Sequence, residues 1–226
     1  MINTLLTSSP LKRRETFTKA TLALREHPAD ARDEGVQTYL LAIGGQSCSI
    51  KLRNHCLDTK VLLRQEQGLE RWQPHLQLAF PLTAAFLHEF LFAWLEIDPP
   101  HFWRQQYTEA QFLRELIIPN PLLCAVPVRK QRRTFTLNGC AMEMTALTVD
   151  ERYHTYTIAV EATAAEKVLD TVNLLGLHNL VNTNYLVGLS QLVGLHVLDP
   201  LGWIDHEPAW TPTPNPRSSS ELVLVR

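Results

Sequence analysis

Hydrophobic and polar residues alternate along much of the chain with the period of two that is typical of β-strands. A Gly-Gly pair at 44–45 predicts a turn between two expected strands, and the polar stretch 27–35 predicts an earlier turn. The stretch 68–82 is expected to be extended or irregular around Pro74, because proline cannot donate to a strand ladder. The first part of the chain is therefore predicted to form strands over 15–24, 36–43, 47–54, 57–65 and 75–80.

The apolar spacing changes to a helical period twice in the middle of the chain. Apolar side chains within 86–95 recur on one helical face after Thr83, a suitable N-cap, and the Asp-Pro-Pro sequence at 98–100 ends the pattern. A second helix is predicted to begin at Thr108, where TEAQ has the form of a capping box, and to end before Pro119.

The later part of the chain repeats the same order, with strands first and helices afterwards. Asn138-Gly139 is a strong hairpin signal between two strands of the second group. A capping box, Thr163 to Glu166, opens the next predicted helix, and Gly176 closes it. The pattern predicts strands over 125–137, 140–149 and 153–162, and a last helix from about Thr183 to Val193 that Gly194 closes.

This order of elements predicts the fold class. Most strands follow one another without βαβ alternation, which disfavours a parallel sheet. We expect an α+β fold in which an antiparallel sheet curls into a tunnel or barrel, with helices packed outside. We also expect a basic leader over 1–13, a single domain over 14–200 and a Pro/Ser-rich tail over 201–226, in which ELVLVR pairs at a sheet edge.

Composition excludes several classes of protein. The chain is 45% hydrophobic and 19% charged, which is typical of a globular protein. Its most apolar run, AFLHEFLFAWL, contains His88 and Glu89 and falls short of the ~20 residues that cross a membrane. The N-terminus has no apolar segment long enough for a signal peptide, so we expect a cytoplasmic protein. Sequences of the GxSxG, Walker A and GxGxxG types do not occur.

The cysteines and histidines do not predict a metal or disulfide site. The four cysteines, at 48, 56, 124 and 140, form no CxxC pair, and the nine histidines form no HExxH motif. We therefore expect buried or half-buried free thiols.

Cations concentrate in the predicted strands, although the formal net charge is −2. Four of them fall within VRKQRRTF at 128–135. Because side chains alternate across a strand, Arg129 and Arg133 lie on the face of Phe135 and Leu137, opposite to Lys130 and Arg132. Two other strands carry same-face pairs, so the candidate phosphate-binding residues are Lys51, Arg53, Lys60, Arg64, Lys130 and Arg132.

Two interpretations of these cations remain open. They are either a solvated outer surface or a concave face that binds a polyanion, where the arginine fork suits phosphate. Glu143 and Glu161 each lie on the small, polar side of an otherwise apolar strand. On neighbouring strands they could hold a hard divalent cation through oxygen ligands, or each could pair with a nearby cation.

The order of these features resembles the CYTH superfamily, the triphosphate tunnel metalloenzymes. The resemblance rests on SIKLRN…DTKVLLRQ, RKQRRTF, CAMEMTAL, TIAVEA, TAAEKVLDTVNLLGL and NTNYLVGL, within 36–195. It implies an antiparallel tunnel whose basic residues cradle a linear triphosphate or polyphosphate, while Glu143 and Glu161 bind Mg²⁺ or Mn²⁺. The family opens with an ExExK strand, but here Glu15-Thr-Phe-Thr-Lys19 carries Phe17 at the central acidic position.

Three functions follow as hypotheses. The first is a metal-dependent phosphohydrolase that acts on tripolyphosphate or nucleoside triphosphates. The second is a non-catalytic module of the same fold that binds polyphosphate or another phosphorylated ligand, which the altered ExExK motif favours. The third is a nucleic-acid binder that uses RKQRR, which the net charge of −2 disfavours. The pattern does not predict an oligomeric state.

Overall fold

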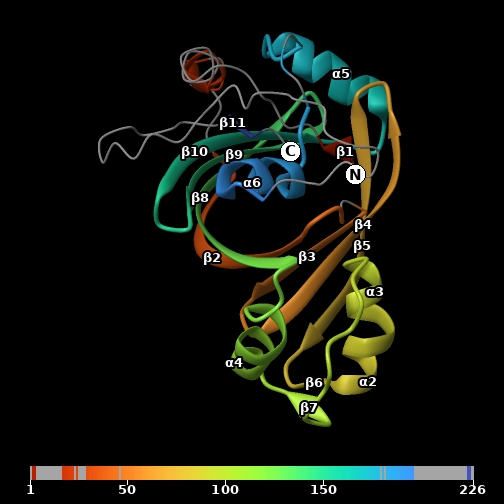
Figure 1. Ribbon diagram of the computed structural model, residues 1–226. Coiled ribbons are helices and arrows are strands. Elements are labelled where there is room, and N and C mark those ends of the chain that lie inside the picture. The colour runs from red at the N-terminus through yellow and green to blue at the C-terminus, as the bar shows by residue number, and fades with distance from the viewer. Residues whose placement is uncertain are drawn as a thin grey trace, which may run out of the picture.

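The main element of the structure is an antiparallel sheet that curls strongly into a half-barrel (Figure 1). A computed structural model describes residues 2–3, 17–22, 24, 29–45, 47–178, 180, 182–195 and 223–224. The long strands lie in the order β5-β4-β3-β2-β8-β9-β10. They are β2 (Ala31–Ala42), β3 (Cys48–Arg53), β4 (Cys56–Glu66), β5 (Leu69–Ala79), β8 (Leu123–Leu137), β9 (Cys140–Val149) and β10 (Tyr153–Glu161). The predicted α+β class and curled antiparallel sheet are confirmed.

Two short strands extend the edges of this sheet. β1 (Ile2–Asn3) pairs antiparallel with β5, and β11 (Val223–Leu224) pairs in parallel with β10. The expected pairing of the C-terminal ELVLVR segment at a sheet edge is thus confirmed at these two residues, while most of 201–226 and most of the leader 1–13 lie outside the described residues.

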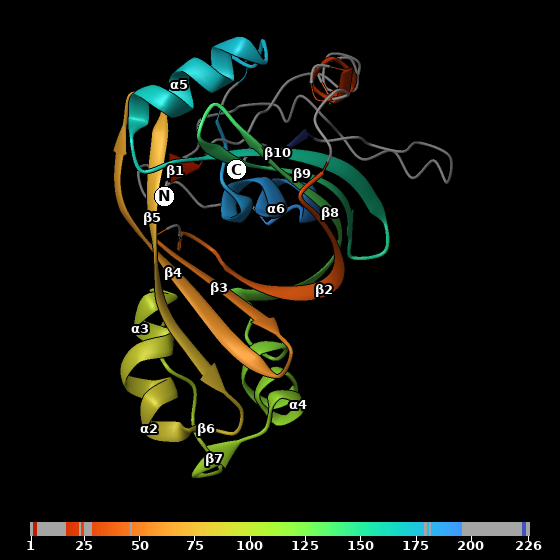
Figure 2. The same ribbon diagram turned by 180° about the vertical axis from the view of Figure 1, so that it is seen from behind.

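Helices α5 (Ala165–Leu174) and α6 (Tyr185–Val193) pack on opposite faces of the sheet. Val168 and Val172 of α5 belong to one hydrophobic cluster with Met142, Ile158 and other outer-face residues. Residues of α6 instead pack in a cluster with side chains from the opposite face of the strands, among them Val128 and Leu147. The expectation of helices packed outside therefore holds for α5, whereas α6 lies within the hollow of the curl (Figures 1 and 2).

A second group of helices packs at the far end of β3 and β4 (Figure 2). We call residues 82–117 the far-end lobe. Phe92 and Phe112 of this lobe are fully buried against Ile50 and Leu57 of the sheet. Its elements are β6 (Leu82–Thr83), α2 (Ala84–Phe86), η1 (Leu87–Leu91), α3 (Phe92–Trp94), β7 (Gln106–Tyr107), α4 (Glu109–Phe112) and η2 (Leu113–Ile117). The two predicted helices are confirmed, with a π-helical turn in each.

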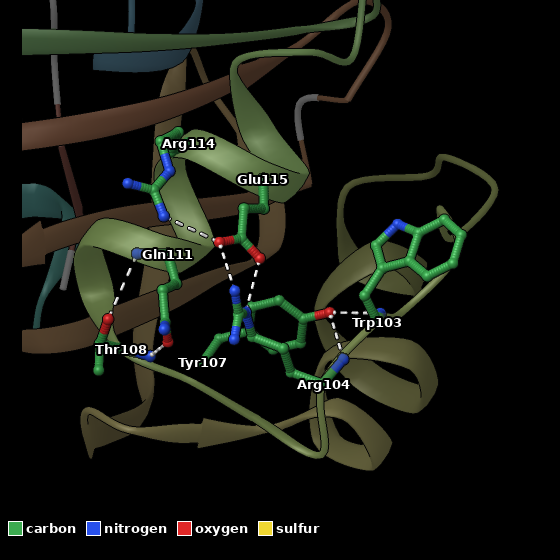
Figure 3. Close-up of polar contacts among 7 residues, drawn as sticks. All are labelled: Trp103, Arg104, Tyr107, Thr108, Gln111, Arg114 and Glu115. Carbon is green, nitrogen blue, oxygen red and sulfur yellow. Dashed lines mark hydrogen bonds and ion pairs between the residues drawn. The ribbon is translucent and has the colours of Figure 1, made fainter.

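Polar contacts hold the far-end lobe together (Figure 3). The predicted capping box is present, because the Thr108 side chain accepts from the Gln111 backbone N–H and the Gln111 side chain accepts from that of Thr108. Glu115 accepts two hydrogen bonds from Arg104, at 2.8 and 3.2 Å, and one from Arg114. These bonds, that of Arg104 first, lower the pKa of the Glu115 carboxyl. We interpret this network as structural.

Two local expectations are wrong, and a third, for the stretch around Pro74, is open between extended and irregular structure. Residues 17–22 of the predicted strand 15–24 are helical. β5 runs through Pro74, which lies opposite Lys60 at a shift in the β4–β5 register, where a missing N–H is tolerated. The N-cap of α5 is Ala164 without a side-chain bond, so Thr163 does not form the predicted capping box.

One turn boundary differs from the expectation, whereas the hairpin turn and the thiols agree with it. β2 begins at Ala31, so the predicted turn 27–35 ends earlier than expected. Asn138 and Gly139 both have positive φ, as a tight hairpin turn requires. All four cysteines are free thiols, and burial raises the pKa of the Cys48 thiol to about 11. Among the helices of the described residues, none is both long and apolar enough to cross a membrane.

Candidate functional site

The strand register determines which predicted site residues share the inner, concave face of the curl. Tyr39 of this face pairs with Lys51 on one side and Val126 on the other, and side chains of equal parity along β8 include Lys130 and Arg132. The same parity continues into β4, β9 and β10. The concave face thus receives Lys51, Arg53, Lys60, Lys130, Arg132, Glu143 and Glu161.

Arg64 does not join this group. The β4–β5 register shifts between Leu62 and Arg64, so Leu62 pairs with Trp72 whereas Arg64 pairs with Arg71. Because adjacent residues of β5 face opposite sides, Arg64 lies on the outer face. There its guanidinium is 3.4 Å from the Glu66 carboxylate, and both side chains are exposed.

Lys130 is the most deeply buried cation of the concave face. Only 1% of its surface is exposed. Its Nζ donates a 2.8 Å hydrogen bond to the Tyr39 hydroxyl and lies 4.0 Å from the centre of the Tyr185 ring. The two tyrosine rings are stacked, with 5.3 Å between centroids. Lys130 therefore sits beneath the first turn of α6 and does not line an open tunnel.

Carboxylates accompany the other concave-face cations. Arg132 Nε is 3.3 Å from Glu143 Oε2, and the Arg132 guanidinium is 3.7 Å from Asp33. Glu143 also accepts a 2.8 Å hydrogen bond from the Thr145 hydroxyl. On β3, Arg53 Nε lies 2.6 Å from Asp58 Oδ2. These acids offset much of the positive charge that the sequence places on this face.

Three buried polar atoms of the described residues have no hydrogen-bond partner, and all three belong to the concave face. They are Gln37 Oε1, Thr155 Oγ1 and Arg132 Nε, whose contact with Glu143 is not aligned as a hydrogen bond. All three lie near Lys130. Gln37 pairs with Val128, the residue of β8 that precedes Lys130 on the same face, and Arg132 follows Lys130 on that face. Thr155 pairs with Leu147, and Leu147 pairs with Lys130. Buried polar groups are rarely left unsatisfied, so this place calls for a bound water or ligand.

Gly35 gives this place room. It pairs directly with Lys130, and a Cβ added to Gly35 would meet no atom within 4 Å. Any larger residue would direct its side chain into this space on the concave face. We call Gly35, Gln37, Lys130, Arg132 and Thr155 the concave polar site.

Glu70 is a buried acid that the sequence did not single out. Its carboxylate accepts hydrogen bonds from the Trp72 indole at 2.8 Å, the Asn184 amide at 2.8 Å and the Gln65 amide at 3.0 Å. Asn184 in turn caps α6, because its side chain accepts from the Val187 backbone N–H. Glu70 therefore fixes the start of the helix that covers Lys130. The sequence pattern left this stretch open between extended and irregular structure, so it did not predict that Glu70 is buried.

The predicted metal ligands lie on the same face but form a small set. Glu143 pairs with Ala159, two residues before Glu161, so the carboxylates are diagonal neighbours on adjacent strands. No three His, Cys, Asp or Glu side chains of the described residues gather as a metal site would require. Two carboxylates suit Mg²⁺ or Mn²⁺ only where phosphate oxygens and water complete the shell.

Comparisons with known proteins add little to this geometry. No family model matches the chain, and neither does any curated protein. A conserved hypothetical protein from Pyrococcus furiosus aligns over 82% of this chain and 98% of its own, with 13% identity and a TM-score of 0.43. A "putative adenylate cyclase" from Bacillus halodurans aligns over 83% of this chain and 94% of its own, with 15% identity and a TM-score of 0.37. Similarity at these levels assigns neither a family nor a function.

Proposed function

We propose that the protein binds a phosphorylated small molecule or polyphosphate on the concave face. The observation that supports this function is the set of unpartnered buried atoms of Gln37, Arg132 and Thr155 beside the open space at Gly35. The Arg132 guanidinium and the Thr155 hydroxyl can donate hydrogen bonds to phosphate oxygens, whereas the unpartnered Gln37 Oε1 accepts one from a ligand hydroxyl or a bound water.

The charge distribution favours an extended anion. Lys51, Arg53 and Lys60 occupy the same face on β3 and β4, beyond Tyr39, at a distance along the sheet from Arg132. A single phosphate would engage one end of this arrangement, whereas a linear chain of phosphates could contact both ends. Arg132 supplies a fork for two oxygens, and the lysines supply point charges.

Metal-dependent hydrolysis of a triphosphate is a second candidate, which the diagonal placement of Glu143 and Glu161 favours. A divalent cation held there would neutralise charge on the transferring phosphoryl group. Two observations make it the weaker candidate. Glu143 is already engaged by Arg132 and Thr145, and Phe17 of the altered ExExK sequence packs on the outer face, 4.4 Å from the Tyr156 ring.

Two adjacent arginines of β8 provide a sharp test, because they face opposite sides of the sheet. Tripolyphosphate is expected to raise the melting temperature of the wild type, since a ligand of the native state stabilises it. Arg132→Gln is expected to weaken tripolyphosphate binding at least about tenfold, because a hydrogen bond to a charged group contributes about 1.5–3 kcal/mol. Arg133→Gln, the matched control on the outer face, is expected to leave it unchanged. Titration calorimetry and thermal shift measure both effects.

The same proteins decide between binding and hydrolysis. Stabilisation by tripolyphosphate without phosphate release, in the presence of Mg²⁺ or Mn²⁺, supports a binding module. Metal-dependent release that is lost in Glu161→Gln supports the hydrolase. If tripolyphosphate and nucleoside triphosphates neither bind nor react, or if Arg133→Gln weakens binding as much as Arg132→Gln, both candidates are wrong.

A further inference from the structure

A pocket of the described residues opens on the outer face of the sheet, and Arg132 of the concave polar site lies at its border. It has a volume of about 770 Å³ and is bounded by the helical residues 17–22 and by strands β2, β8, β9 and β10. Small-molecule sites commonly have volumes of about 300–1,000 Å³. This pocket is therefore large enough for a ligand, and the concave-face residues do not explain it.

One side of the pocket wall is apolar, whereas residues of β2 and β8 give the other side charged and polar groups. Phe135 and Met144 are buried members of the outer hydrophobic cluster, and Phe17 packs against Tyr156 at its side. Ala146 of β9 also lines the pocket and is half-buried, which leaves space above the sheet. The apolar side suits an apolar body better than an extended polyanion.

Two arginines lie at the mouth of the pocket. Arg32 of β2 pairs directly with Arg133 of β8, and both side chains are exposed. Like charges directly opposite each other on a sheet destabilise it, unless an anion lies between them. Arg133 belongs to the outward half of VRKQRRTF, which the concave polar site does not use.

The acids that line the pocket do not cancel this charge. The Glu34 carboxylate lies 3.8 Å from the guanidinium of a third outer-face arginine, Arg129. Asp33 faces the other side of the sheet, where it lies 3.7 Å from Arg132. Three arginines and one glutamate therefore share the outer face at this place, with a formal excess of positive charge.

We propose that this pocket binds a small amphipathic anion. Its apolar body lies against Phe135, Met144 and Tyr156, and its carboxylate or phosphate lies between Arg32 and Arg133. An arginine pair binds such groups through bidentate hydrogen bonds. The proposal does not rest on the function proposed above, because Arg32 and Arg133, which hold the anion, face away from the concave polar site, although Arg132 borders both sites.

Decanoate and decyl phosphate are suitable probes, and decanol is the uncharged control. Calorimetry and thermal shift on the full chain are expected to detect binding of both anions, and at least about tenfold weaker binding of decanol. Arg133→Gln and Arg32→Gln are each expected to weaken decanoate binding about tenfold. Arg71→Gln, an exposed outer-face arginine away from the pocket, is expected to have no effect. Ala146→Leu is expected to weaken decanoate binding while the protein remains folded, because the larger side chain occupies part of the pocket beside Tyr156.

Several results would overturn the proposal. Equal affinity for decanoate and decanol would remove the role of the arginines, and undiminished binding by Ala146→Leu would place the ligand elsewhere. Salt-dependent binding of an oligouridylate that Arg133→Gln removes, without binding of decanoate, would identify a nucleic-acid surface instead. Loss of tripolyphosphate binding in Arg132→Gln is compatible with every one of these results, so the two proposals fail separately.

Discussion

Replacing Glu70 with alanine is expected to lower the free energy of unfolding by about 3 kcal/mol, because buried donors then lose their acceptor. The carboxylate accepts hydrogen bonds from Trp72, Asn184 and Gln65, and Glu70 itself is only 6% exposed. Leaving one buried donor unsatisfied costs about 1–3 kcal/mol, and Gln65 has access to water that reduces its share. Urea denaturation followed by circular dichroism measures the change.

Two further variants isolate the cause. Glu66→Ala removes an exposed acid of the same β4–β5 hairpin, whose contact with Arg64 is between exposed groups, and is expected to change stability by less than about 1 kcal/mol. Glu70→Gln keeps one acceptor oxygen, so its loss in free energy of unfolding is expected to lie between those of Glu66→Ala and Glu70→Ala. A loss from Glu70→Ala no larger than that from Glu66→Ala would show that the carboxylate does not hold α6 in place.

Replacing Tyr185 with alanine is expected to lower the free energy of unfolding by about 4 kcal/mol, more than Glu70→Ala does. The ring is 5% exposed, stacks on Tyr39 and covers the Lys130 ammonium. Truncating a buried aromatic residue typically costs about 3–5 kcal/mol, and the loss of aromatic and cation–π contacts adds to the cavity. The same denaturation experiment gives the value.

Tyr185→Phe is the matched control. It keeps the ring and removes the hydroxyl, which is 3.4 Å from the Thr157 hydroxyl, so a cost of about 1 kcal/mol is expected. If Tyr185→Phe is as damaging as Tyr185→Ala, the hydroxyl and not the ring is what stabilises the hollow. A stable Tyr185→Ala protein would mean that α6 is not an integral part of the core.

Strand parity predicted the β8 site residues because nothing interrupts their alternation. β8 pairs with β2 and β9 without a register shift, so Lys130 and Arg132 face one side while Arg129 and Arg133 face the other, as the sequence indicated. The same reasoning placed Arg64 beside Lys60, where it does not lie. A bulge after Leu62 reverses the parity, and no residue type in LDTKVLLRQ marks a bulge.

The N-terminal error has a different origin. Threonine and phenylalanine favour strands by propensity, and ETFTKATLAL contains three threonines and one phenylalanine. Phe17, Ala20 and Leu24 also follow a helical spacing, and all three pack into the outer hydrophobic cluster. Tertiary packing therefore overrode a propensity that is weak by itself.

The burial of Lys130 could not be derived from the sequence at all. The pattern placed its side chain on the concave face but carried no information that α6 would fill the hollow and lay Tyr185 over the ammonium. Such a contact depends on the path of the chain between Glu161 and Tyr185. The polar atoms of Gln37 and Thr155 became significant only when their burial was known.

The pairing of β2 with β8 also constrains the order of folding. All 12 residues of β2 pair with β8, although residues 43–122 lie between the two strands. Closing so long a loop costs entropy before any pairing energy is gained, whereas the β3–β4 and β4–β5 hairpins close through short turns. Residues 31–37 of β2 pair with β8 alone, so in pulse-labelled hydrogen exchange their amides are expected to gain protection after those of β4. The pairing of β2 with β8, which closes the hollow, would then be the last part of the sheet to form.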